Sequence, residues 1–160
     1  MITTRYFKPT DAKKVATMIA TTLRTSNCQD YSSDYLEALI AEMPPAFFVA
    51  KAQQTHFYVF ESDGQIVGTG AIGSYWGKKT EFSLFDIFAL PTFQGHGLGR
   101  KIIETLEADD YFKQATRVEI PASITALGFY QHMGYTFKAG HDTLDDEKLY
   151  RLEKFPTHTR

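Results

Sequence analysis

Apolar residues recur at helical spacing in two stretches near the N-terminus. The first stripe consists of Val15, Met18, Ile19, Thr22 and Leu23, and the second of Tyr35, Leu36, Leu39, Ile40 and Met43. A Pro-Thr-Asp sequence at 9–11 is a typical helix start, Ser32 or Ser33 can cap the second helix, and the Pro-Pro pair at 44–45 ends it. With residues 2–7 as a short strand before them, the pattern predicts one strand followed by two amphipathic helices.

The period of the pattern changes to two at Thr55. Residues 56–61 and 65–76 alternate around a Gly-containing turn at 62–64, which is typical of a β-hairpin. Residues 80–90 are apolar with little alternation and predict a buried fourth strand. The segment 46–54 fits a strand, a loop or a frayed helical turn, and its structure stays open.

Another amphipathic helix is predicted after residue 97. Its inward positions are Leu98, Ile102, Ile103 and Leu106. The pair Asp109-Asp110 follows, and carboxylates oppose the negative end of a helix dipole, so we expect the helix to fray or end there.

The remaining chain predicts three strands and one helix. Residues 116–120 form a strand whose pairing Pro121 should end, because proline has no N–H to donate. Ser123 is expected to cap the next helix and Gly134 to end it. Residues 135–140 and 147–155 then supply two closing strands around a polar loop at 141–146.

Composition narrows the class of protein. The chain has 160 residues, of which 43% are apolar and 22% charged, as expected of one ordinary globular domain. A net charge of −2 argues against nucleic acid as the main partner. No apolar run approaches the ~20 residues that span a membrane, and no secretion signal precedes the first strand, so we expect no membrane association and a cytoplasmic location. Cys28 is the lone cysteine, and the histidines lack metal-ligand spacing, so we expect no metal.

The stretch 86–100, DIFALPTFQGHGLGR, carries the clearest chemical signal. An apolar strand is followed by Gly95, Gly97 and Gly99 and then at once by the predicted helix. Free N–H groups at the positive end of a helix dipole bind phosphate, and Arg100 adds a formal charge. The glycines match neither a Walker loop, which needs Lys-Ser/Thr after the last glycine, nor the G-x-G-x-x-G dinucleotide fingerprint.

The spacing Gln94-x-x-Gly97-x-Gly99 resembles the acetyl-CoA signature of the GNAT acyltransferases, Q/R-x-x-G-x-G/A. A second stretch, SITALGFYQHMGY from Ser123 to Tyr135, is similar to the family's N-x-x-A-x-x-F-Y-x-x-x-G-F/Y. Ser123 departs from that pattern, because the family most often has Asn there. The resemblance covers residues 1–155 as a single domain, with 156–160 as a tail. It implies an α/β (α+β) fold whose central, mixed, mostly antiparallel twisted sheet has six to seven strands, with about four helices.

The resemblance implies direct transfer of an acetyl group from acetyl-CoA to a primary amine, with both substrates held together and no covalent intermediate. The cofactor-binding residues that it implies are Phe88, Ala89, Leu90, Gln94, Gly95, His96, Gly97, Leu98, Gly99, Arg100, Ser123, Ala126 and Tyr130. The backbone of 88–90 would pair with the pantetheine arm, and the N–H groups of 95–100 would hold the pyrophosphate.

Tyr130 occupies the position of the family's general acid. A phenol has a pKa near ~10, close to that of a thiol, so it can give a proton to the CoA thiolate. The general base is less defined: Glu119 and Glu81 lie close to positions that relatives use, and Asp86, a carboxylate inside an apolar strand, is a third candidate. A chain of water molecules is the fourth.

The acceptor is not defined by the sequence. In the family, the first two helices and their connecting loop wall the acceptor pocket, so Tyr31, Tyr35, Phe47 and Phe48 are either substrate contacts or core aromatics. A small-molecule amine and a protein N-terminus or lysine both stay open. A non-catalytic acyl-CoA-binding domain of the same fold is the alternative function, and a homodimer formed through sheet edges is a further expectation.

Overall fold

The structure, a computed structural model, describes residues 1–156, so most of the expected tail 156–160 lies outside the described residues. Within that range one sheet of seven strands has the order β1-β2-β3-β4-β5-β7-β6. The strands are β1 (Ile2–Tyr6), β2 (Thr55–Ser62), β3 (Gln65–Ser74), β4 (Glu81–Ala89), β5 (Arg117–Ala122), β6 (Thr136–Phe137) and β7 (Tyr150–Lys154). All neighbours are antiparallel except the parallel pair β4–β5. The expected mixed, mostly antiparallel sheet is confirmed.

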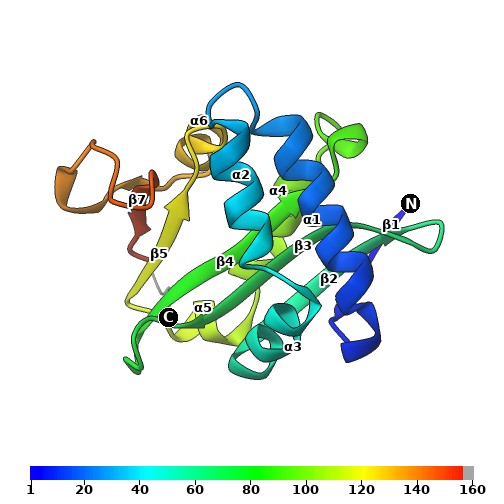
Figure 1. The fold of residues 1–160 in the computed structure, drawn as a ribbon. Helices are drawn as coiled ribbons and strands as arrows, with labels where there is room; N and C mark the ends of the chain where they lie inside the picture. The colour runs from blue at the N-terminus through cyan, green and yellow to red at the C-terminus, as the bar shows by residue number, and fades with distance from the viewer. Residues whose placement is uncertain (157–160) are drawn as a thin grey trace.

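Helices cover both faces of the sheet (Figure 1). They are α1 (Ala12–Ser26), α2 (Ser33–Ala41), α3 (Pro45–Gln54), α4 (Leu98–Glu107), α5 (Asp110–Gln114) and α6 (Leu127–His132). The apolar stripes of α1, α2 and α3 pack on one face with Phe57, Val59 and Ala71. The stripe of α4, with Phe112 and Tyr130, packs on the other face around Phe82 and Leu84. The periodicity of the sequence thus predicted the buried sides of α1, α2 and α4.

Two helices, α3 and α5, were not resolved by the periodicity of the sequence. Residues 46–54 are helical: α3 begins with Pro45 at its first position, where the missing N–H costs nothing, and buries Phe48 completely. The helix α4 ends before Asp109 as expected, and Asp109 is the N-cap of the next helix, α5. Its carboxylate accepts the N–H of Tyr111 at 2.8 Å and so caps the start of that helix, where negative charge is favourable.

The expectation that Pro121 ends pairing is wrong. Strand β5 continues through it, with Pro121 opposite Arg151 and Ala122 opposite Tyr150 on β7. On its other side β5 pairs with β4 only up to Glu119, so at Pro121 the strand has a single neighbour. A residue without an N–H is tolerated at such an edge.

The closing strands are shorter than predicted. Strand β6 is followed at once by a 3₁₀ turn over Lys138–Gly140, and β7 begins only at Tyr150. The glycine that was expected to end α6, Gly134, does so in the left-handed conformation, with φ +98°.

Two irregularities of β4 open the sheet. Only Glu81, Phe82 and Ser83 pair with β5, after which the two strands diverge (Figure 1). On the other edge, the register with β3 shifts between Thr69 and Ala71, opposite a bulge that includes Asp86 at φ +51°. The divergence leaves backbone and side chains of β4 facing a space that the sheet does not fill.

Candidate active site

A cavity of about 670 Å³ occupies the divergence of β4 and β5. Its walls come from the end of α1, from α2, from β4, from the loop 94–97 with the start of α4, and from the segment 120–130 that leads into α6. Most of the lining is apolar. Asp86 and Arg100 are the two charged side chains that line it within residues 1–156. The cavity therefore has one cationic and one anionic position in an otherwise uncharged space.

The cavity brings together most of the residues that the sequence predicted as cofactor contacts. Those that line it are Phe88, Ala89, Gln94, Gly95, Gly97, Gly99, Arg100, Ser123, Ala126 and Tyr130. Leu90, His96 and Leu98 do not line it. Leu98 is 1% exposed and packs in the core, and the N–H of Leu90 already donates to Val67 O at 2.8 Å.

The glycine loop places the N-terminus of α4 at the cavity wall. Gly97 is the residue before the helix, with φ +82°, and an added Cβ would meet no atom within 4 Å. Glycine at position 99 is explained by packing, because an added Cβ would lie 3.1 Å from the ring of Phe129. The amide of Gln94 donates to Ser26 Oγ and to Ala89 O, both at 2.9 Å, and so ties the loop to α1 and β4. A small anion can thus approach the free N–H groups.

Tyr130 reaches the same cavity from α6. Its side chain is 6% exposed, and its hydroxyl makes no hydrogen bond within residues 1–156. Burial raises the pKa of Tyr130 well above its ordinary value. The phenol is therefore protonated at neutral pH and free to donate to a bound molecule.

Ser123 orders the turn before α6 and does not cap the helix directly. Its Oγ accepts the N–H of Ala126 at 3.1 Å, while α6 itself begins at Leu127. Two contacts join this turn to the α1–α2 loop: Thr125 Oγ1 donates to Asp30 at 2.7 Å, and the Ile124 N–H donates to the hydroxyl of Tyr31 at 2.9 Å. These contacts join the α1–α2 loop to the turn before α6, and Tyr31 and Thr125 line the cavity.

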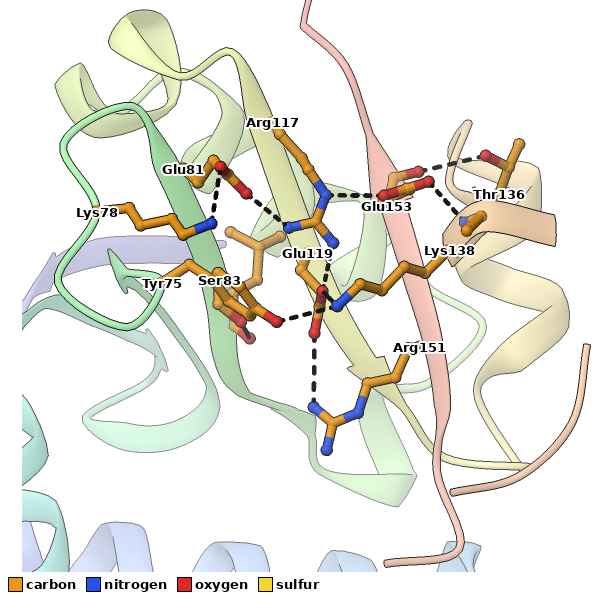
Figure 2. A network of polar contacts seen from close by, with 12 residues as sticks. Tyr75, Lys78, Glu81, Ser83, Arg117, Glu119, Thr136, Lys138, Arg151 and Glu153 are labelled. Atoms are coloured by element: carbon orange, nitrogen blue, oxygen red, sulfur yellow. Dashed lines mark hydrogen bonds and ion pairs between the residues drawn. The ribbon is translucent and has the colours of Figure 1, made fainter. Parts of the chain in front are cut away.

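Glu119, the first candidate base, lies outside the cavity lining in a cluster of charged side chains between β4, β5 and β7 (Figure 2). Its carboxylate is 2% exposed and pairs with Arg117, with Lys138 Nζ at 3.0 Å and with Arg151 at 3.7 Å. Lys138 also donates to the hydroxyl of Tyr75 at 2.9 Å. The oxygens of Glu119 are thus engaged by protein cations, and its role as base stays a prediction.

Glu81, the second candidate, belongs to the same cluster. It lies 3.2 Å from Arg117 and 3.3 Å from Lys78, and it does not line the cavity. Its burial acts to raise the pKa of the carboxyl, but Lys78 and Arg117 outweigh this and the pKa lies below its usual range. Glu81 as base also stays a prediction.

Asp86, the third candidate, is the carboxylate that lines the cavity. The residue is half-buried, its Oδ2 is shut off from solvent, and neither oxygen has a hydrogen-bond or ion-pair partner within residues 1–156. Burial raises the pKa of Asp86 to about 6, although Lys51 opposes the shift. Unpartnered buried carboxylates are costly, which marks this one as a functional candidate.

Comparison with known proteins identifies the family of the chain. The family model for the acetyltransferase (GNAT) domain matches residues 53–137, which include the glycine loop, Asp86 and Tyr130. The chain belongs to the GNAT acetyltransferase family. No curated protein sequence matches it.

Solved structures share the fold of this GNAT domain at low sequence identity. The PaiA N-acetyltransferase of Thermoplasma acidophilum, crystallised with coenzyme A, has 15% identity and a TM-score of 0.82 over 98% of this chain and 99% of its own. A GCN5-related N-acetyltransferase of Rhodopseudomonas palustris has 20% identity and a TM-score of 0.79, covering 96% and 95%. Ard1 of Thermoplasma volcanium has 17% identity and a TM-score of 0.72, covering 98% and 99%.

The GNAT cavity also contains residues whose role the sequence did not resolve. Helix α2 contributes Tyr35, Leu36 and Leu39, and Met43 follows it. Helical spacing predicted that these residues share an inward face. The same spacing is found in helices that pack on a core and in helices that border a cavity, so it does not distinguish the two. Tyr31 and Tyr35 line the cavity, whereas Phe47 and Phe48 do not.

Two features are absent from residues 1–156. No group of three or more His, Cys, Asp or Glu side chains is placed to hold a metal ion there. Over the same range, every helix is too short or too polar to cross a membrane.

Proposed function

We propose that this GNAT domain transfers the acetyl group of acetyl-CoA to a primary amine by direct attack, with both substrates bound together. The observation that supports the proposal is the convergence of the α4 N-terminus, the diverging edge of β4 and the free hydroxyl of Tyr130 on one cavity. The related fold of PaiA, crystallised with coenzyme A, supports the same ligand.

The residues present fit coenzyme A. The N-terminus of α4 and Arg100 would hold the pyrophosphate, since the free N–H groups and the guanidinium combine hydrogen bonds with positive charge. The open space above Gly97 leaves room for the phosphates. The edges of β4 and β5 that lack a partner would pair with the pantetheine amides. When bound, acetyl-CoA supplies the acetyl group as an activated thioester.

Tyr130 is proposed as the general acid. Its hydroxyl is protonated at neutral pH and faces the cavity without a protein partner, so it can protonate a thiolate that leaves there. Holding two substrates in one cavity removes much of the entropic cost of their encounter. The same proposal includes three further points: the domain spans residues 1–155, the protein is cytoplasmic, and it forms a homodimer.

Ligand-dependent stability tests the cofactor. The unfolding midpoint of the protein is measured with CoA, acetyl-CoA, ATP and NAD at matched concentrations. A ligand that binds only the folded state at a hundredfold excess over its Kd stabilises it by about 2.7 kcal/mol. We expect a shift with CoA and acetyl-CoA and none with NAD. CoA binding would be contradicted if ATP alone shifted the midpoint, or if none of the four ligands shifted it.

Thiol release from acetyl-CoA with a panel of primary amines tests the reaction. Acetylation of at least one amine, with CoA released in equal amount, is the expected result. If CoA binds and no amine is acetylated, the alternative of a non-catalytic acyl-CoA-binding domain of the same fold takes its place.

A further inference from the structure

The cavity holds a carboxylate for which the fold provides no partner. The backbone at Asp86 is in the left-handed region, φ +51°, which an L-residue adopts at a cost. Thr69 Oγ1 donates to the carbonyl of Asp86 at 2.7 Å and holds the bulge in place. A strained backbone that presents an unpaired carboxylate to a cavity is an arrangement that a cationic ligand would complete.

The walls around this carboxylate are apolar. From β4 come Phe85, Ile87 and Phe88, and the α2 side contributes Leu36, Leu39 and Met43. None of these side chains can pair with a second charge on the ligand, and an unpaired charge is costly in such surroundings.

Tyr31 and Tyr35 offer ring surface to the cavity and, unlike Tyr130, no free hydroxyl. The hydroxyl of Tyr31 donates to Lys148 O at 2.7 Å and accepts the Ile124 N–H, and that of Tyr35 donates to Glu147 O. Their rings stack at a centroid distance of 5.1 Å. They therefore border the cavity as aromatic surface.

Cations flank the same region. Lys51 Nζ lies 4.3 Å from the ring centroid of Phe85, and Lys148 Nζ lies 5.4 Å from that of Tyr35. A ligand with several positive charges would be repelled by Lys51 and Lys148. A ligand with one ammonium group can place that charge next to Asp86, which has no ion-pair partner within residues 1–156.

We propose that Asp86 receives the ammonium group and acts as the general base, and that the acceptor is a small monoamine with an apolar body, such as an arylalkylamine. This inference rests on the proposed acetyl transfer. It assigns Arg100, the cation of the cavity lining, to the phosphates of CoA, and Asp86, the carboxylate of the lining, to the amine.

The proton balance of the step follows from these positions. The ammonium gives one proton to Asp86, and the amine then forms a bond to the acetyl carbon. The carbon–sulfur bond breaks with its electron pair on sulfur, and Tyr130 protonates the thiolate. The second proton on nitrogen restores the Tyr130 hydroxyl, and Asp86 releases its proton to solvent.

The substitution Asp86→Asn is the sharpest variant. It preserves the shape of the side chain, and Asn tolerates the left-handed backbone as well as Asp does. The control is Asp63→Asn, because Asp63 has a similar φ of +49° in the exposed β2–β3 turn. Thiol release is measured with 2-phenylethylamine and with spermidine as acceptors, and CoA binding is measured by calorimetry.

We expect the wild-type protein to have a kcat/KM for 2-phenylethylamine at least ten times that for spermidine. Asp86→Asn should lower the value for 2-phenylethylamine by 100-fold or more and leave the Kd for CoA within twofold, while Asp63→Asn changes neither. Asp86→Asn with full activity would overturn the role of Asp86. Spermidine as the better acceptor would overturn the apolar monoamine but not acetyl transfer, whereas a protein that neither binds CoA nor acetylates any amine would remove the proposed function itself.

Stability separates this role from a structural one. The pKa of Asp86, about 6 in the folded protein, lies above its ordinary value, so the ionised carboxylate destabilises the fold as pH rises through 6. Asp86→Asn should therefore raise the urea midpoint most at pH 7.5, and the gain should shrink as pH falls toward 3.8, the ordinary pKa of an aspartate. A lower midpoint at pH 7.5 would mean that Asp86 supports the fold, and the proposal would fall.

Discussion

Tyr130 illustrates how burial without a partner creates a reactive group. The neighbouring motif tyrosine, Tyr135, is equally buried but donates to Glu107 Oε2 at 2.9 Å. The hydroxyl of Tyr130 has no such bond and faces the cavity. The hydroxyl of Tyr135 is therefore engaged in a structural hydrogen bond, whereas that of Tyr130 is available to a bound molecule.

Tyr130→Phe removes this hydroxyl and little else. We expect kcat to fall by roughly 10²-fold or more, with the KM for acetyl-CoA nearly unchanged, because the loss affects the leaving thiolate and not binding. Steady-state thiol release measures both constants. In the control Tyr135→Phe, kcat should stay at the wild-type value while stability falls by about 1 kcal/mol, the typical value of a lost hydrogen bond. Equal rates for Tyr130→Phe and wild type would exclude Tyr130 as the acid.

The residues of the site differ in how far the sequence could predict them. The resemblance to the family's two signatures implied that Gln94, Gly97 and Tyr130 share one site, and all three line the cavity. The same resemblance placed Glu119 first and Glu81 second among the candidate bases, and that order stays a prediction. Whether a carboxylate meets cations, as Glu119 does, or none, as Asp86, depends on side chains that arrive from distant strands.

At the scale of elements, the glycine loop and α4 make a test of the phosphate site possible. Gly97 has φ +82° and Gly64, in the β2–β3 turn, has φ +78°. An added Cβ meets no atom within 4 Å at either position. Alanine therefore introduces the same backbone strain, about 1–2 kcal/mol, at both. The positions differ only in their surroundings, since Gly97 borders the cavity.

Gly97→Ala should weaken CoA binding tenfold or more, because the relaxed backbone turns the N–H groups at the start of α4 away from the phosphates. Gly64→Ala should lose the same stability and bind CoA as tightly as wild type. Calorimetric titration with CoA and urea unfolding give the two quantities. The same affinity in both variants would mean that the glycine serves only the turn.

The sequence predicted an element correctly where its apolar residues followed a single period. It failed where the extent of an element depends on pairing with another strand. The alternation in β2 and β3 and the stripe of α4 fixed those elements. The extension of β5 through Pro121 depends on β4 having departed from its other edge, a non-local event that no local pattern contains. The same divergence creates the cavity, so the site's shape was the part least accessible to the sequence.

At the scale of the whole molecule, the cluster of charged side chains in Figure 2 lies outside the cavity, between β4, β5 and β7. That cluster joins three strands through Arg117, which lies 2.7 Å from Glu153 and 3.2 Å from Glu81 and also pairs with Glu119. The Arg117 side chain is 12% exposed, so these pairs are little screened by solvent. The cluster closes the end of the sheet where β4 and β5 still pair, and so fixes the point from which they diverge.

Removing Arg117 would leave carboxylates on three strands without their common partner. Burial acts to raise the pKa of Glu153, but the Ala139 N–H and Arg117 outweigh it, and the pKa lies below its usual range. The pKa of Glu81 is lowered too. A depressed pKa in the folded state contributes stability above the unfolded pKa, and this stability is lost as pH falls through the folded value.

Arg117→Met should therefore destabilise the protein by roughly 3 kcal/mol at pH 7, the cost of leaving buried carboxylates unpaired. The penalty should shrink as pH falls toward 3, because protonation of the carboxylates removes the charges with which Arg117 pairs. Lys78→Met is the control, because Lys78 contacts Glu81 but is 55% exposed and should cost less than about 1 kcal/mol. Urea unfolding at both pH values measures these differences. A penalty of the same size at pH 7 and pH 3 would trace the effect to lost packing of the Arg117 side chain over Tyr75, 5.1 Å away, and not to its charge.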